Sequence, residues 1–98
     1  MKAVEQKFHK VKCWSEFFQM KWDGKKDWEL RKNDRNYKVG DFLIQEEGDV
    51  QHDDFVRTGR VLTEQITYIL KDQPQFGLEK GYCIMSTKEI EREKTKEL

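Results

Sequence analysis

The most informative part of the chain is one charged stretch, residues 24–35, which reads Gly24-Lys25-Lys26-Asp27-Trp28-Glu29-Leu30-Arg31-Lys32-Asn33-Asp34-Arg35. It holds five cationic and three acidic side chains within twelve residues. Trp28 and Leu30 alternate with polar neighbours, which predicts a β-strand with one buried face. The opposite face would carry Asp27, Glu29 and Arg31. A charged row of this kind, entered through a glycine turn, suits an anionic or polar ligand.

The residues before Gly24 predict a strand followed by a short helix. Side chains alternate between two faces from Phe8 to Trp14, as in a strand. Ser15 is a residue type that caps helix N-termini, and Gly24 is one that follows helix ends. A helix is therefore expected from Ser15 to about Asp23. Its aromatic side chains recur at near-helical spacing and are Trp14, Phe17, Phe18 and Trp22.

The residues after Arg35 predict three more strands, separated by turns and loops. The strands are expected at residues 41–45, 59–70 and 81–87, and the loops at 46–58 and 71–80. Apolar side chains on both faces of the longest segment indicate a central strand that is covered on both sides. The charges of residues 88–98 alternate in sign, which predicts a frayed helix or a disordered tail.

The helix and the strands do not alternate along the chain, which argues against a doubly wound parallel sheet. We expect an α+β fold: a small curved sheet or mixed β-barrel of about five strands, with the early helix packed at one end. A chain of 98 residues forms one domain, whose core would span about residues 7–87. Six Phe, three Trp and three Tyr would supply much of its buried area.

The formal net charge of zero argues against a protein that binds long polyanions, since such proteins usually carry a basic excess. The charges are unevenly distributed, because residues 1–26 carry seven lysines and three acids. Residues 46–54 carry five acids and neither lysine nor arginine. This acidic segment predicts either a loop that binds a protein partner or a solvated surface.

Cys13 and Cys83 are far apart and lie in apolar, strand-like segments, which predicts free buried thiols and a cytoplasmic protein. A zinc site is not expected, because the histidines and cysteines show no pairing at metal-ligand spacing. No cofactor is expected either. No apolar run approaches the roughly 20 residues of a membrane-spanning helix, so we do not expect a membrane partner.

Three blocks of sequence resemble the ASCH domain superfamily, and within it a small bacterial and phage family of unknown function. The first block runs from His9 to Arg35, and the second is Tyr37-Lys38-Val39-Gly40-Asp41. The third extends from Thr58-Gly59-Arg60 to Gly81-Tyr82. The resemblance covers about residues 7–87 and implies a PUA-like β-barrel.

The resemblance also implies a function. Members of the superfamily are associated with RNA binding, and a few are small amidohydrolases that act on acylated cytidines. Their Gly-x-Lys-x-x-x-x-Arg motif lines a cleft beside the helix, and here it corresponds to Gly24, Lys26 and Arg31. In the hydrolases a hydroxyl residue lies three positions after the lysine, whereas this chain has Glu29 there. Glu64 is a candidate for the acid that those members take from further along the chain.

We therefore expect a cleft that binds RNA or a nucleotide-like ligand, with a small amidohydrolase acting on an acylated nucleoside as the alternative. Lys26 would contact a phosphate or, in an enzyme, act as base or nucleophile with Glu29 assisting. Trp22 and Trp28 flank the glycine turn, and either could stack a nucleobase or fill the core. The full set of candidate ligand contacts is Lys26, Glu29, Arg31, Arg35, His9 and Trp28.

Structural roles compete with these assignments. Lys26 could be a surface lysine without a ligand. Arg31 could form a salt bridge with Glu29 or Asp41, alone or in addition to binding a ligand. His9 could be a half-buried polar residue of its strand.

Overall fold

The computed structural model describes residues 5–94 and shows an α+β fold with one five-stranded sheet and one α-helix. Residues 95–98 of the predicted charged tail lie outside the described part of the chain. The elements, in chain order, are β1 (Phe8–Trp14), α1 (Ser15–Trp22), β2 (Trp28–Lys32), β3 (Phe42–Gln51), β4 (Asp54–Lys71), the 3-10 turn η1 (Pro74–Phe76) and β5 (Tyr82–Lys94).

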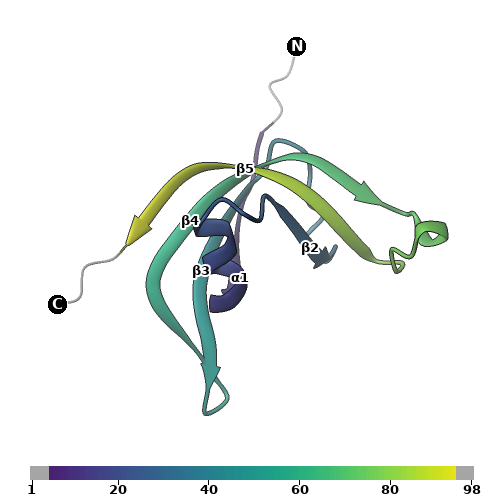
Figure 1. Ribbon diagram of the computed structural model, residues 1–98. Helices are drawn as coiled ribbons and strands as arrows, with labels where there is room; N and C mark the ends of the chain where they lie inside the picture. The colour runs from purple at the N-terminus through teal and green to yellow at the C-terminus, as the bar shows by residue number, and fades with distance from the viewer. Residues whose placement is uncertain (1–4, 95–98) are drawn as a thin grey trace.

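The sheet is mixed and open. Its strand order is β1-β3-β4-β5-β2, with β1 parallel to β3 and every other neighbouring pair antiparallel. The predicted β-barrel is therefore wrong: within residues 5–94, β1 and β2 are edges that no strand pairing joins. The long strands β4 and β5 nevertheless curve strongly (Figure 1). Two shifts in their pairing, at Thr63/Glu64 and at Ile66/Tyr68, contribute to the curvature, because bulges bend strands.

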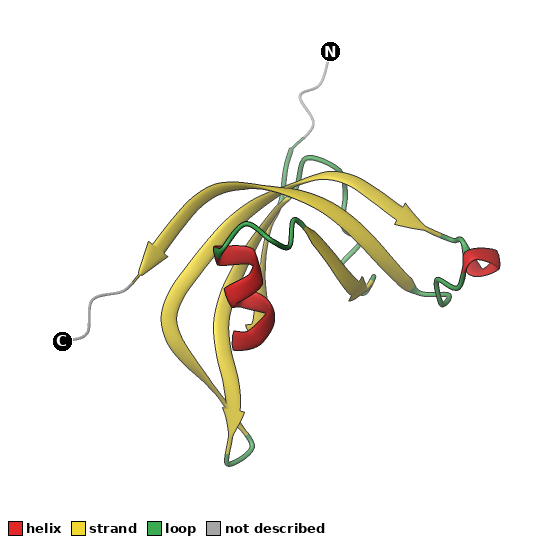
Figure 2. Ribbon diagram, in the orientation of Figure 1, coloured by secondary structure: helices red, strands yellow, loops and turns green. Residues whose placement is uncertain are grey.

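Helix α1 lies on the concave side of the sheet (Figure 2) and packs against β1 and β3. Its Phe18 side chain is fully buried, and Gly24 follows its end with a φ of 73°, as glycine after a helix commonly does. The predicted serine cap is wrong, because Trp14 occupies the N-cap position. The hydroxyl of Ser15 instead donates a 2.6 Å hydrogen bond to Asp49, which ties the start of the helix to β3.

Two charged segments that read as irregular in the sequence are strands in the structure. Residues 46–58 are not a loop, since β3 and β4 run through them and meet at a tight turn of His52 and Asp53, both with positive φ. Residues 88–94 form the end of β5 and pair with β4. Strand formation here depends on backbone pairing with a neighbour, which side-chain composition does not reveal.

The core consists of two apolar clusters with polar side chains between them. The larger cluster contains Val11, Tyr37, Leu43, Ile66, Cys83 and Met85, and the smaller contains Cys13, Phe18 and Leu62. Successive inward side chains of β4 are Leu62, Glu64 and Ile66, so a buried carboxylate stands between the two clusters. Strand β3 likewise places a polar side chain inward next to an apolar one, because Leu43 and Gln45 are buried on the same face. A polar layer thus divides the interior.

Candidate functional site

A pocket of about 350 Å³ opens between the two edge strands. We call the gap between β1 and β2 the seam. The pocket is lined from β1 by Lys12, Cys13 and Trp14, from α1 by Phe17, from the turn after the helix by Lys26, and from β2 by Trp28, Glu29, Leu30 and Arg31. The charged stretch that the sequence singled out therefore forms one wall of a concave site.

Strand β2 turns the opposite face inward from the one that its sequence predicts. Glu29 is buried, whereas Trp28 and Leu30 are exposed, so the prediction of a buried Trp28–Leu30 face is wrong. The reason is Lys21, whose side chain is fully buried on the inner side of β2. A buried ammonium needs an opposite charge beside it, and Glu29 supplies that charge only by facing inward.

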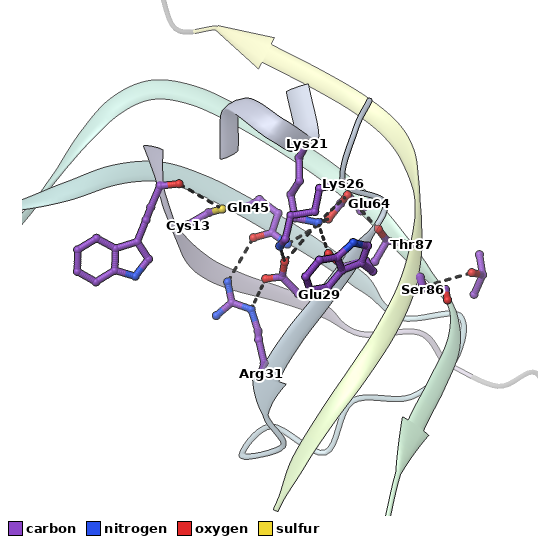
Figure 3. Close-up of polar contacts among 12 residues, drawn as sticks. Cys13, Lys21, Lys26, Glu29, Arg31, Gln45, Glu64, Ser86 and Thr87 are labelled. Atoms are coloured by element: carbon purple, nitrogen blue, oxygen red, sulfur yellow. Dashed lines mark hydrogen bonds and ion pairs between the residues drawn. The ribbon is translucent and has the colours of Figure 1, made fainter. Parts of the chain in front are cut away.

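Lys21 holds three structural elements together. Its Nζ atom lies 3.0 Å from Oε1 of Glu64 on β4 and 3.3 Å from Oε1 of Glu29 on β2. It also donates a 3.1 Å hydrogen bond to the backbone carbonyl of Trp28. Figure 3 shows the ammonium directed into this group of acceptors. One side chain thereby fixes the helix to β2 and β4, in addition to its packing against β1 and β3.

The contacts close into a ring of side chains. Gln45 Nε2 donates to Glu64 Oε1 at 3.1 Å, and Gln45 Oε1 accepts a 3.3 Å hydrogen bond from Arg31 Nη2. Arg31 Nε donates to Glu29 Oε2 at 2.6 Å. The other oxygen of Glu29 contacts Lys21, and this contact completes the ring. We call this set the buried ring; its members are Lys21, Glu64, Gln45, Arg31 and Glu29. The hydroxyl of Thr87 adds a 3.0 Å hydrogen bond to Glu64.

The floor of the pocket carries an excess of positive charge. Lys12, Lys26 and Arg31 line the pocket with a single acid, Glu29. Three cations contact the carboxylate of Glu29: Lys26, with Nζ 3.2 Å from Oε1, Arg31, and the buried Lys21, which does not line the pocket. Burial by itself would raise the pKa of Glu29, but the attraction of these three cations outweighs it and holds that pKa below its ordinary value of 4.5. Glu29 is therefore ionised at neutral pH.

Exposed aromatic rings surround this floor. Trp14, Phe17 and Trp28 line the pocket and remain 53%, 47% and 45% exposed. The ammonium of Lys26 lies 5.6 Å from the ring centroid of Phe17 and 4.6 Å from that of Trp28. These distances are typical of cation–π contacts. The rim thus presents flat apolar surfaces beside a cation.

Two arginines cross the seam. Arg31 Nη2 donates a 2.7 Å hydrogen bond to the carbonyl of Lys12, and Arg35 Nη1 donates one of 2.7 Å to the carbonyl of Lys10. A second hollow of about 270 Å³ adjoins the pocket and shares Leu30 and Arg31 with it. Its other lining residues are Lys32, Asp34, Arg35, Tyr37 and Tyr82.

The structure brings most of the predicted ligand contacts together. Lys26, Trp28, Glu29 and Arg31 line the pocket, and Arg35 lines the second hollow. The salt bridge between Arg31 and Glu29 is confirmed. His9 lines neither hollow: it is buried, and its Nε2 atom lies 2.9 Å from Oδ2 of Asp41. Trp22 is packed against the smaller apolar cluster.

Sequence reasoning missed Lys21, Gln45 and Thr87. Lys21 follows the buried Phe18 by three residues, a spacing that places both on one face of a helix and could have indicated an inward lysine. Glu64 was named only through the resemblance, although its place between Leu62 and Ile66 on an alternating strand also marks it as inward.

The two cysteines are free and buried, as predicted. Cys13 lines the pocket, but burial raises the pKa of its thiol to about 11. The thiol is therefore protonated at neutral pH, and the reactive thiolate form is scarce. This argues against Cys13 as a nucleophile.

Most of the acidic segment at residues 46–54 is compensated within the fold. Glu46 and Glu47 pair with arginines on β4, and Asp49 accepts the hydrogen bond from the helix start. Hydrogen bonding from Arg60 holds the pKa of Glu47 below its ordinary value. The role of this segment in binding a protein partner stays a prediction.

Two further classes of feature do not occur among residues 5–94. No group of three or more His, Cys, Asp or Glu side chains is arranged to hold a metal ion. No helix in this part of the chain has the length and apolar character that crossing a bilayer requires.

We predict that Lys21→Met strongly destabilises the protein, because it leaves Glu29 and Glu64 buried without their shared cation. The free energy of unfolding in urea should fall by about 3–5 kcal/mol. Lys25→Met, at an exposed lysine in the next turn, should change it by less than about 0.5 kcal/mol. Equal effects of the two substitutions would contradict the role given to Lys21.

Stability should also fall in acid. The pKa of Glu29 is lowered from 4.5, and that of Asp41 is lowered from 3.8 because hydrogen bonds from His9, Lys7 and Lys38 outweigh its burial. Groups with lowered pKa values stabilise the fold above their ordinary values and lose that contribution as the pH falls below them. Urea denaturation between about pH 7 and about pH 3 should show a decline that begins near pH 4.5. Glu29→Gln should be less stable at neutral pH and show a shallower decline, and an identical profile would contradict this assignment.

Comparison with known proteins gives one curated relative and one family. An uncharacterised 12.9 kDa protein of Escherichia phage P2, described as lying in the GpA 3' region, is 46% identical over 61 residues. The match covers 62% of this chain and about half, 52%, of the phage protein. The family described as Domain of unknown function (DUF3850) matches residues 8–87, which include every element from β1 into β5 and all residues that line the pocket. The chain therefore belongs to this DUF3850 family.

Proposed function

We propose that the pocket in the seam binds a nucleotide-like ligand, either free or as part of an RNA. The observation that carries the proposal is the rim of three exposed aromatic rings around a charged floor. An exposed aromatic ring is usually found singly, whereas Trp14, Phe17 and Trp28 converge on one hollow. Converging rings offer a flat ligand a stacking surface worth about 1–3 kcal/mol per base.

The charged floor would supply the polar contacts to the ligand. Lys26 and Arg31 line the pocket with cationic donors, and both are fixed by Glu29. Side chains held in this way lose little freedom when a ligand binds, which favours affinity. The pocket volume of about 350 Å³ lies near the lower end of small-molecule sites and suits one base with its sugar.

Two further observations support this function. The Gly24, Lys26 and Arg31 positions match the motif of the ASCH superfamily, whose members are associated with RNA binding. The formal net charge of zero favours a short ligand over a long nucleic acid tracked along its backbone. The affinity should accordingly decline only gently with salt, by about 0.7 logarithmic units per tenfold increase for each phosphate contact.

Tryptophan fluorescence tests the proposal directly, because two of the three tryptophans line the pocket. We predict saturable quenching by nucleosides or short RNA, and a loss of about tenfold in affinity for Trp28→Ala. Phe76→Ala removes an aromatic ring that is 81% exposed and outside the pocket, and should leave the affinity unchanged. If nucleosides, short RNA and duplex DNA all fail to change the fluorescence, the proposal is wrong.

A small amidohydrolase that acts on an acylated nucleoside is the second candidate. It is favoured by one observation: an amine and a carboxylate, Lys26 and Glu29, lie side by side in the pocket, with the Lys26 side chain only 15% exposed. Against it stands the geometry of the amine: Lys26 Nζ lies 3.2 Å from Glu29 Oε1 and 4.6 Å from the ring centroid of Trp28, so the fold already engages it as a structural contact. Ligand binding therefore accounts better for this arrangement.

An activity assay separates the two candidates. If the protein is an amidohydrolase, it will release the free amine from an N-acylated cytidine, and Lys26→Ala will abolish turnover while stacking on the rim persists. If it is only a binding module, we expect the acylated nucleoside to bind without conversion. Mass spectrometry of the incubated nucleoside measures the outcome, with Lys25→Ala as the control for loss of an exposed lysine.

A further inference from the structure

The second hollow adjoins the aromatic pocket and has a different chemical character. Three cationic side chains, those of Arg31, Lys32 and Arg35, line it together with one acid, Asp34. Leu30, Tyr37 and Tyr82 complete its lining. The aromatic rim belongs to the pocket alone, since Trp14, Phe17 and Trp28 do not line the second hollow. Both hollows carry cationic side chains, but the exposed indole and phenyl rings lie only at the pocket, and both arginines that cross the seam lie at the second hollow.

Arg31 joins the two hollows. It lines both of them, while its Nε and Nη2 atoms are held by Glu29, Gln45 and the Lys12 carbonyl. Its Nη1 atom donates to no residue of the described chain. Arg35 uses only Nη1 toward the carbonyl of Lys10, so its other N–H groups are likewise without partners within residues 5–94. Both guanidinium groups are therefore oriented by the fold and retain unused donors.

We infer that the second hollow is the phosphate subsite of the ligand whose base stacks in the aromatic pocket. The inference rests on the proposed function and narrows it: the ligand class is a phosphorylated nucleoside or the equivalent unit of an RNA, not a free nucleoside. A phosphate needs several oriented N–H donors and an excess of positive charge, and guanidinium groups meet both needs. Asp34 opposes the phosphate by its charge, but it is exposed and free to turn toward solvent.

The test compares a nucleoside, its 5'- and 3'-monophosphates and a trinucleotide by fluorescence titration at fixed salt. One of the phosphorylated ligands should bind about tenfold more tightly than the nucleoside, which corresponds to about 1.4 kcal/mol. Arg35→Ala should remove that advantage while leaving nucleoside affinity unchanged. Lys38→Ala, at an exposed lysine outside both hollows, should preserve it.

A second substitution works in the opposite direction. Asp34→Asn removes the one carboxylate of the hollow, so it should tighten binding of the phosphorylated ligand about two- to fivefold and leave nucleoside binding unchanged. This gain of affinity does not arise from damage to the fold. It therefore keeps the test decisive even if Arg35→Ala weakens the contact with β1.

The outcomes distinguish a failure of the phosphate subsite from a failure of the proposed nucleotide-binding function. If the nucleoside binds and its phosphates bind no better, the phosphate subsite is overturned and the pocket remains a nucleoside site. If the phosphate advantage survives Arg35→Ala, the subsite does not lie in the second hollow. If nothing binds, both proposals fall. Tighter binding of the trinucleotide than of either monophosphate would support the subsite and assign it to RNA.

Discussion

The structure depends on the burial of one ammonium group. The Nζ atom of Lys21 lies within 3.3 Å of carboxylates from two strands and of a backbone carbonyl, and no part of its side chain reaches solvent. A charge in this position requires compensation, so Glu29 and Glu64 must both face inward. Glu29 then orients Lys26 and Arg31, which form the floor of the pocket. The site is thus the outer surface of a structural ion-pair network.

Because of this dependence, the residues that stabilise the interior also shape the wall of the pocket. The buried ring contributes the oriented guanidinium of Arg31 to the pocket, and its Glu29 also holds Lys26 there, while Lys21, Gln45 and Glu64 bind one another in the interior. A network of this kind restricts the register in which β2 can pair with β5. Sliding β2 by one residue would replace the inward Glu29 with an apolar side chain. Retaining charged residues inside a small domain therefore fixes one arrangement of the pocket wall.

Much of the fold could be predicted from local pattern, and the failures have a common physical cause. The strand at Phe8–Trp14, the short helix and the glycine after it follow from alternation and turn chemistry. The inward face of β2 could not be predicted from its own sequence, because the apolar side chains Trp28 and Leu30 would ordinarily be buried. Here Glu29 is buried instead, since it pairs with a buried lysine on another element. The open sheet was missed for a similar reason, since pairing between distant strands leaves no local signal. Four pocket residues were found because they lie in the one charged stretch; Gln45 and Thr87 come from other strands.

The arginines that cross the seam also bear on how the protein avoids pairing with other chains. An open sheet has two edges whose free backbone groups invite additional strands and, through them, aggregation. Here Arg31 and Arg35 already occupy carbonyls of β1, and the bulky charged side chains stand where an incoming strand would have to lie. The β1 edge of the seam is thereby protected at Lys10 and Lys12 by side chains, without a backbone ladder between β1 and β2. The gap thus keeps a pocket of about 350 Å³ open, while two of the β1 carbonyls that an incoming strand would need are already occupied.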